Sequence, residues 1–209
     1  VRPAAGLPLI HLDEPSLTGP KRALKRTGDL FVAIPLVILL IPVYALIAVA
    51  IKFDSLGRAL YVSDRIGRSG ETFRCIKFRS MHIGADRLRS DVIGDLDEDV
   101  ADRYREDPRV TRVGHVLRRW SLDELPQLFN VIKGEMSLVG PRPERPVFVE
   151  DFKKKIPRYM QRHKVKAGMT GWAQVNDWRG NTSIDKRIEY DLYYIEHWSL
   201  AFDLKILLH

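Results

Sequence analysis

Two neighbouring carboxylates, Asp123 and Glu124, stand at the edge of an apolar run in the stretch SLDELPQLFNVIKGEMSLVGPRPE, residues 121–144. Arginines lie on both sides of the pair, at Arg118 and at Arg142, which two prolines enclose. Arginine binds phosphate through two parallel hydrogen bonds, and a rigid backbone lowers the entropic cost of aiming it. Carboxylates among arginines suit a Mg²⁺ ion shared with a diphosphate. The stretch therefore predicts an enzyme that handles phosphoryl groups.

The same residues also have a purely structural interpretation. Ser121 and Glu124 have the spacing of a capping box, which would begin a helix. Pro126 weakens this interpretation, because it would remove an early helical hydrogen bond. The two interpretations are compatible, since a carboxylate at a helix N-terminus stays ionised, as a nucleophile must. The apolar face of the helix would be Leu125, Leu128, Phe129 and Ile132.

Composition limits the class of partner. The net charge of +7 and the pI of about 9.6 predict an anionic partner, such as nucleic acid, a membrane surface or a phosphate-bearing substrate. A long apolar run and an acidic stretch at residues 86–107 argue against nucleic acid. The sequence has no Walker lysine loop, GxGxxG, HExxH or paired CxxC. The one cysteine, Cys75, excludes an intrachain disulfide and is expected to be a buried strand residue rather than a reactive thiol.

Residues 30–51 form an apolar run without a single charged side chain. As a helix rising 1.5 Å per residue it would reach roughly 33 Å, enough to cross the hydrocarbon core of a membrane. Pro35 and Pro42 would kink this helix. Cations flank both ends, which favours keeping both on the cytoplasmic side. We therefore expect a re-entrant helix, with a crossing helix and a buried soluble helix as the alternatives.

The remaining pattern predicts a few further elements. Two strand-like stretches flank GRSGE and indicate a hairpin whose turn uses Gly67 and Gly70. Residues 84–106 have the pattern of an acidic, solvated helix, and residues 163–183 read as a basic loop. Residues 184–208 have a helical pattern rich in aromatic side chains, which would either lie at the membrane–water boundary or pack on the core. These aromatics are Tyr190, Tyr193, Tyr194, Trp198 and Phe202.

The sequence resembles the bacterial sugar transferases in five blocks, which are KRTGD, DRIGRSGETFRCIKFRSM, SLDELPQLFNVIKGEMSLVGPRPE, GMTGWAQVN and EYDLYYIEHWSLAFDLKI. These proteins are monotopic polyprenyl-phosphate phosphoglycosyl transferases, which start glycoconjugate and exopolysaccharide assembly. The resemblance runs from Lys25 to the C-terminus. Residues 179–182 and the ending around Trp198 look most like the branch that uses UDP-glucose or UDP-galactose.

The resemblance implies a ping-pong mechanism. Asp123 would attack the β-phosphate of a UDP-sugar, expel UMP and hold the phosphosugar until undecaprenyl phosphate, or another polyprenyl phosphate, takes it. Glu124 would assist through Mg²⁺, with both carboxylates as metal ligands, and the cofactor would thus be Mg²⁺. The positions matched to phosphate or nucleotide binding are Lys77, Arg79, Arg118, Pro141, Arg142 and Pro143. The positions matched to membrane anchoring are Lys25, Arg26, Asp29 and Pro42.

The expected fold is a helix-rich α+β domain with a short β-hairpin. Its parts would be an N-terminal extension (1–20), a re-entrant membrane helix (21–53) and a cytosolic catalytic domain (54–209) with interfacial amphipathic helices. The expected location is the cytoplasmic face of the bacterial inner membrane. The expected partners are a UDP-sugar, polyprenyl phosphate and membrane lipid, without nucleic acid; the oligomeric state is left open, a dimer included.

Some residues depart from the family pattern. Ile41 precedes Pro42 where the family often has serine, and Pro35 is an additional proline. Ser63 stands where glutamine is usual, and Asp177 stands where Asn-Gly is common. A rival interpretation is a membrane-bound UDP-sugar glycosyltransferase or diphosphatase with the same carboxylates around a metal. Product analysis separates the two, because a glycosyltransferase releases UDP instead of UMP.

Overall fold

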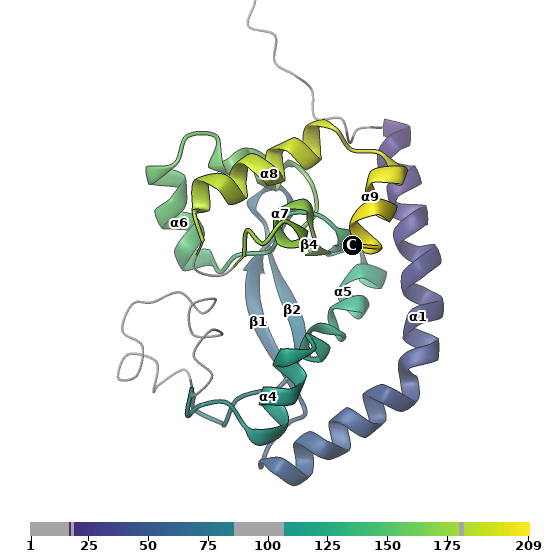
Figure 1. Cartoon of the computed structure of the whole chain (residues 1–209), viewed down its shortest axis with the longest axis vertical. Coiled ribbons are helices and arrows are strands. Elements are labelled where there is room, and N and C mark those ends of the chain that lie inside the picture. The colour runs from purple at the N-terminus through teal and green to yellow at the C-terminus, as the bar shows by residue number, and fades with distance from the viewer. Residues whose placement is uncertain (1–16, 18, 86–106, 180–181) are drawn as a thin grey trace, which may run out of the picture.

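The computed structural model describes residues 17, 19–85, 107–179 and 182–209, and there the chain is a helix-rich α+β fold, as expected (Figure 1). The helix expected over residues 84–106 lies outside the described residues from position 86 on. In chain order the elements are α1 (Gly19–Asp54), β1 (Leu60–Ile66), η1 (Arg68–Gly70), β2 (Thr72–Phe78), α4 (Arg112–Arg119), η2 (Leu122–Glu124), α5 (Gln127–Lys133), β3 (Ser137–Val139), α6 (Pro146–Lys155), η3 (Tyr159–Lys164), β4 (Gly168–Thr170), α7 (Trp172–Val175), α8 (Ile184–Glu196) and α9 (Leu200–Leu207), where η marks a 3-10 helix.

The predicted hairpin is confirmed by β1 and β2, which pair antiparallel with Leu60 opposite Phe78. Gly70 has a φ of 79°, the left-handed conformation that glycine adopts without strain, whereas Gly67 is extended. Both predicted glycines belong to the turn: Gly70 adopts the left-handed conformation, and the Gly67 amide donates to the Glu71 carbonyl at 2.8 Å. Cys75 is 1% exposed on β2, and burial raises the pKa of its thiol. This confirms a buried strand residue of low reactivity.

A second pair of strands, β3 and β4, is parallel, and β4 lies within residues 163–183, which were expected to be a basic loop. The loop prediction is wrong for β4 and α7, because strands and helices of three or four residues are too short to give a periodic pattern. Gly168 in β4 lies so close to Gly140 that a Cβ on either residue would collide with the other's backbone. The two glycines thus allow the chain after β3 to lie directly against β4.

The C-terminal region forms two helices, α8 and α9, instead of the single helix predicted over 184–208. The break is stabilised by Ser199, whose hydroxyl accepts a hydrogen bond from the Phe202 amide at 3.1 Å and begins α9. Tyr194 and Trp198 are buried, while Tyr193 is about half exposed. Two of the five aromatics thus belong to the core, where they face α1.

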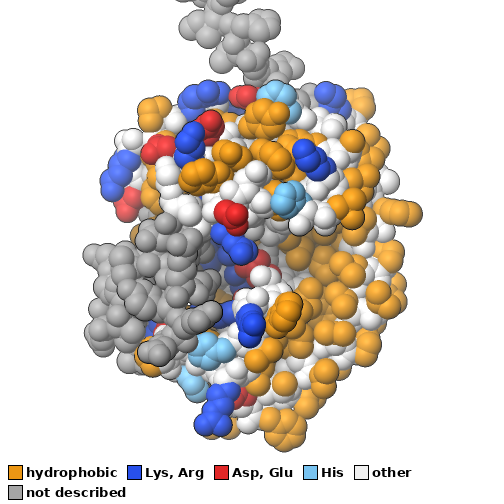
Figure 2. Space-filling view, viewed as in Figure 1, with side chains coloured by type: hydrophobic (Ala, Val, Ile, Leu, Met, Phe, Trp, Pro, Cys, Tyr) orange, Lys and Arg blue, Asp and Glu red, His pale blue; other side chains and the backbone are white. Residues whose placement is uncertain are grey.

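Helix α1 continues through Pro35 and Pro42 but changes direction part-way along its length, as Figure 1 shows. Among the described residues it is the one helix long and apolar enough to cross a membrane, and only 11% of its most apolar 18-residue window is buried. Figure 2 shows a band of hydrophobic side chains on the side of the molecule that α1 occupies. Exposed members of α1 include Phe31, Ile38, Leu39, Ile41, Leu46, Val49 and Phe53. This exposure is unlike that of a soluble core helix.

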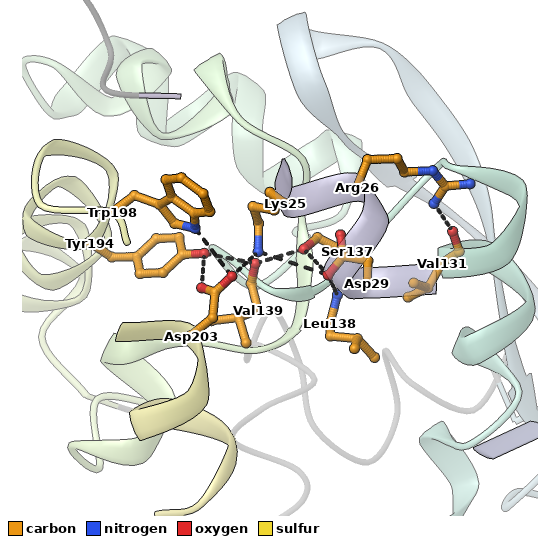
Figure 3. Close-up of polar contacts among 10 residues, drawn as sticks. All are labelled: Lys25, Arg26, Asp29, Val131, Ser137, Leu138, Val139, Tyr194, Trp198 and Asp203. Carbon is orange, nitrogen blue, oxygen red and sulfur yellow. Dashed lines mark hydrogen bonds and ion pairs between the residues drawn. The ribbon is translucent and has the colours of Figure 1, made fainter. Parts of the chain in front are cut away.

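A buried ion pair connects the beginning of α1 to α9. The Lys25 ammonium lies 2.7 Å from the Asp203 carboxylate, which also accepts hydrogen bonds from the Tyr194 hydroxyl at 2.7 Å and the Trp198 indole at 3.1 Å (Figure 3). All four side chains are less than a tenth exposed. Asp203 therefore joins α1, α8 and α9 through one carboxylate.

Two further α1 side chains contact the rest of the chain. The Asp29 carboxylate accepts a hydrogen bond from the Leu138 amide of β3 at 3.1 Å. The Arg26 guanidinium donates to the carbonyls of Val131 and Ile132 (at 2.7 Å to Ile132), where a cation complements the C-terminal end of α5 (Figure 3). Three of the four residues that the family resemblance matches to membrane anchoring, Lys25, Arg26 and Asp29, thus contact the folded domain. Their role at the membrane stays a prediction.

Asp203→Asn is expected to lower the free energy of unfolding by about 3–5 kcal/mol, because it removes the nearer carboxylate of the buried Lys25 ammonium and leaves only Asp29, at 3.9 Å. The matched control is Glu196→Gln, which removes an exposed carboxylate 3.3 Å from Arg158 and should cost less than about 1 kcal/mol. Denaturation of the purified proteins in detergent measures both changes. Equal effects of the two substitutions would contradict a structural role for Asp203.

Candidate active site

A cleft of about 1640 Å³ brings the predicted site residues together. Asp123 and Glu124 line it from η2, Lys77 from β2 and Arg142 from the loop after β3. Figure 2 shows acidic and basic side chains gathered around the hollow near the middle of the face in view. The structure therefore unites residues from two separate stretches of the sequence, the one that contains Lys77 and the one over residues 121–144.

The turn that carries the two carboxylates differs from the predicted helix start. Ser121 has a left-handed backbone (φ 53°), and its side chain makes no capping hydrogen bond, so the capping-box interpretation is wrong. The chain forms the single turn η2, and α5 begins only at Gln127, because Pro126 cannot donate a helical hydrogen bond. Phe129 is 40% exposed and lies off the buried face that Leu128 occupies.

Glu124 is held by two cations instead of capping a helix. Its Oε1 accepts from the Lys77 ammonium at 2.8 Å and from the Arg142 guanidinium at 3.1 Å. Burial alone would raise the pKa of Glu124, but Arg142 and Lys77 outweigh it and hold the pKa well below its usual range. Burial likewise opposes the charge of Lys77, yet Glu124 raises the pKa of this ammonium. All three groups are therefore ionised at neutral pH, beside Asp123, which is 7% exposed.

The fully buried Asn130 attaches α5 to the edge of β2. Its Oδ1 accepts from the Ile76 amide at 3.0 Å, and its Nδ2 donates to the Arg74 carbonyl at 2.7 Å. The side chain thus replaces a neighbouring strand and fixes the part of β2 that presents Lys77. The sequence analysis missed Asn130, although a lone amide between Phe129 and Val131 was a signal for a buried polar contact.

A buried charge cluster supports the loop that carries Arg142. The Arg162 guanidinium, 1% exposed, donates to the Arg142 carbonyl at 2.9 Å and pairs with Asp191 at 2.8 Å. Glu144, two residues after Arg142, pairs with Arg187 at 3.0 Å. These charges satisfy one another away from water, as buried ions require. No sequence pattern indicated Arg162, which stands in a basic stretch that resembles a solvated surface.

Two predicted phosphate-binding arginines line the cleft but also have structural partners. Arg79 donates to the carbonyls of Leu56 and Ser55 (at 2.9 Å to Ser55), just beyond the end of α1. Arg118 donates through Nε to the Ser80 hydroxyl at 2.9 Å. Arg79 therefore fastens the end of α1, and Arg118 presents its guanidinium at the wall of the cleft.

The two prolines around Arg142 contribute through their carbonyls. Pro141 accepts from the Gly168 amide at 2.9 Å, and Pro143 accepts from the Arg65 guanidinium at 3.5 Å. The loop is therefore tied to β4 on one side and to β1 on the other. Because both prolines also fix their own backbone angles, Arg142 projects from a rigid support.

The residues present fit a magnesium ion only together with substrate phosphates. The described residues contain no group of three or more His, Cys, Asp or Glu side chains arranged for a metal. Mg²⁺ commonly binds to one or two carboxylates and completes its shell with phosphate oxygens and water. Asp123 and Glu124 meet this need as adjacent oxygen donors on the wall of one cleft.

Comparison with known proteins identifies the family. The model for "Bacterial sugar transferase" matches residues 20–209, nearly all of the chain. The chain belongs to the bacterial sugar transferase family. This confirms the family inferred from the five sequence blocks.

Curated members of the family are similar to this chain over most of its length. A UDP-glucose:undecaprenyl-phosphate glucose-1-phosphate transferase of Escherichia coli K12 is 44% identical over 205 residues, covering 96% of this chain and 42% of the relative. A protein of the same name from Caulobacter vibrioides is 41% identical over 212 residues, covering 100% of this chain and 72% of the relative. A UDP-N-acetylgalactosamine-undecaprenyl-phosphate N-acetylgalactosaminephosphotransferase of Aeromonas hydrophila is 42% identical over 185 residues, covering 88% and 41%. The chain thus spans about two fifths of the E. coli and A. hydrophila sugar transferases.

Lys77→Met is expected to lower the stability of the folded chain at neutral pH and to make that stability depend less on acid. Because the pKa of Glu124 is lower in the folded chain than its usual 4.5, Glu124 stabilises the fold above that pH and loses this contribution as the pH falls from 4.5 to the folded pKa. Removing Lys77 raises the folded pKa towards 4.5, so the variant has less of this stabilisation to lose. Thermal unfolding between about pH 2 and 8 measures the smaller fall in melting temperature with acid.

The matched control for Lys77→Met is Lys186→Met, which removes an exposed ion pair of similar length, 2.7 Å, with Glu189. This variant should follow the wild-type pH dependence, since exposed pairs contribute little. If Lys77→Met also follows the wild-type curve, the ion pair does not set the protonation of Glu124.

Proposed function

We propose that this chain transfers a sugar-1-phosphate from a UDP-hexose, glucose or galactose, to undecaprenyl phosphate or another polyprenyl phosphate, with release of UMP. The observation that carries the proposal is the buried carboxylate of Asp123 on the wall of the cleft, beside a glutamate held by Lys77 and Arg142. The names of the similar proteins support the two substrates, and differ among themselves in the sugar.

The proposed reaction has two displacement steps. In the first, a carboxylate oxygen of Asp123 bonds to the β-phosphorus of the UDP-sugar, and the bond from that phosphorus to the bridging oxygen breaks, so that UMP leaves with the electron pair. In the second, a phosphate oxygen of the polyprenyl phosphate attacks the same phosphorus and Asp123 regains its carboxylate. The product is a polyprenyl diphosphate sugar, and the protein returns to its starting state.

The cations of the cleft have a clear part in this scheme. A carboxylate is a weak nucleophile and repels the diphosphate that it must attack, so fixed positive charge has to offset that repulsion. Lys77 and Arg142 supply this charge, and Glu124 holds both of them in place from one oxygen. A Mg²⁺ ion bound by Asp123, Glu124 and the substrate would supply further neutralisation of the phosphates.

The membrane arrangement is the second part of the proposal. Helix α1 enters and leaves the membrane on one side, and the remaining chain lies as a cytosolic domain on the inner membrane of a bacterium. The change of direction in α1, its interior prolines, its exposed apolar side chains and the cations at both ends support this arrangement. The cleft would then open beside the interface at which polyprenyl phosphate keeps its charged group.

Asp123→Asn is expected to reduce UMP release by a factor on the order of 10³ or more, because the amide cannot form the acyl phosphate bond. No labelled phosphosugar should accumulate on the variant protein. The measurement incubates membrane-purified protein with a panel of labelled UDP-sugars and undecaprenyl phosphate, and quantifies UMP and the protein-bound label.

Asp151→Asn is the matched control, since it makes the same chemical change at an exposed position on α6, outside the residues that line the cleft. It should release UMP at the wild-type rate. A folded Asp123→Asn protein with near-normal UMP release would exclude the covalent step. Release of UDP by the wild type would instead indicate the rival glycosyltransferase.

Single cysteines at Lys21 and Lys52, exposed at the two ends of α1, test the membrane topology in a Cys75→Ser background. Both are expected to react with an impermeant reagent from the cytoplasmic side only. Labelling from opposite sides would show that α1 crosses the membrane. Pro42→Leu restores a helical hydrogen bond near the change of direction and should move the Lys21 position to the far side.

A further inference from the structure

Residues 30–51 contain no charged side chain, and Tyr44 is the one residue among them whose side chain can form a conventional hydrogen bond. Its hydroxyl donates to the main-chain carbonyl of Leu125 at 2.9 Å. Leu125 directly follows Asp123 and Glu124. An apolar side chain would serve a lipid-facing helix better than a hydroxyl, which costs free energy in hydrocarbon unless it is bonded. The hydroxyl thus connects the membrane helix to the turn that carries the carboxylates.

The ring of Tyr44 lies between the elements that build the site. It packs against Phe78 at a centroid distance of 5.7 Å and against Phe129 at 5.6 Å. Phe78 ends the strand that presents Lys77, and Phe129 belongs to the helix that follows the carboxylates. The same apolar cluster includes the buried Ile47 of α1. Packing therefore fixes the ring, and the hydroxyl has a defined direction.

Helix α1 holds α5 at both of its ends. Arg26 donates to the Ile132 carbonyl at the C-terminal end, and Tyr44 donates to the Leu125 carbonyl just before the N-terminal end. The two helices therefore run antiparallel along this contact. Of the two attachments, that of Tyr44 is next to the carboxylates, and it comes from the part of α1 that follows Pro42.

The peptide that Tyr44 contacts has little other support from its own helix. The residue after Leu125 is Pro126, which has no N–H to donate, so the peptide between them can be held only through the Leu125 oxygen. That oxygen accepts from the Leu128 amide at 3.0 Å as well as from Tyr44. Of these two hydrogen bonds, the one from Tyr44 comes from a different helix, α1.

We infer that Tyr44 is a positioning residue whose hydroxyl fixes the orientation of the carboxylate turn from the membrane helix. The orientation of the turn then depends on the position of Tyr44 on α1. This inference rests on the proposed function for its kinetic consequence. It does not depend on which hexose is transferred.

Tyr44→Phe in the full chain, reconstituted in lipid nanodiscs, tests the inference because it keeps the ring and removes only the hydroxyl. We expect kcat for UMP release to fall about 10- to 100-fold, since small misplacements of reacting groups have effects of this size. The KM for the UDP-hexose should change less than about twofold, because the groups that bind substrate remain. Incorporation of 3-fluorotyrosine at position 44 retains the donor and should retain kcat.

The matched control is Tyr193→Phe, which removes a hydroxyl from a tyrosine that is 48% exposed on α8. It should keep the wild-type kcat. If Tyr44→Phe also keeps it, or raises KM at unchanged kcat, the inference is wrong. If kcat falls in Tyr44→Phe and falls equally when 3-fluorotyrosine occupies position 44, the hydroxyl is not the cause and the inference is also wrong.

Hydrogen exchange separates a failure of this inference from a failure of the proposed function. In Tyr44→Phe the amides of residues 124, 125, 127 and 128 should exchange faster than in the wild type, while those of the hairpin β1–β2 stay unchanged. A wild-type chain that releases no UMP with any UDP-sugar defeats the proposed function, but the exchange result still decides whether Tyr44 holds the turn. Unchanged exchange at residues 124–128 overturns the inference.

Discussion

The buried ion pair between Lys25 and Asp203 is the contact on which the remaining arrangement depends. Helix α1 is mostly apolar and much of it is exposed, so directional polar contacts near its beginning fix its position on the domain. Lys25 supplies the ion pair at 2.7 Å, and Asp29 and Arg26 follow one helical turn or less away. With α1 in place, α5 is held, and with α5 the turn that carries the carboxylates.

The pairing of charged side chains is the second constraint, and it applies both in the cleft and in the buried cluster behind it. In the cleft, the single carboxylate of Glu124 contacts both Lys77 and Arg142, so this group of three side chains keeps one net positive charge. Behind the cleft, Arg162 and Asp191 neutralise each other and support the Arg142 backbone from a place that water does not reach. Burying Arg162 and Asp191 costs desolvation free energy, and the pair in return fixes the position of the Arg142 backbone. The charged groups of Lys77, Glu124 and Arg142 line the cleft instead. A flexible loop could carry Arg142 but could not aim it.

Much of the site could be predicted from sequence, because its residues stand in short, characteristic stretches. Asp123, Glu124 and Arg142 were found from their spacing, and the hairpin with Cys75 from alternation. The capping box failed because it treats Glu124 locally, while its actual partner Lys77 comes from a strand 47 residues earlier in the chain. Asn130, Glu144 and Arg162 were missed for the same reason. Their role depends on contacts between distant segments, and spacing in one segment cannot reveal such contacts.

Because α1 contacts both ends of α5, α1 cannot be exchanged during evolution independently of the rest of the domain. A segment added ahead of Gly19 disturbs none of the contacts described for Arg26 and Tyr44. Exchange of α1 itself for another apolar helix would remove the partners that Arg26, Tyr44 and Lys25 provide for the Ile132 carbonyl, the Leu125 carbonyl and Asp203. A gene fusion that adds a segment before α1 therefore keeps these contacts, whereas α1 and the rest of the folded domain must be inherited together.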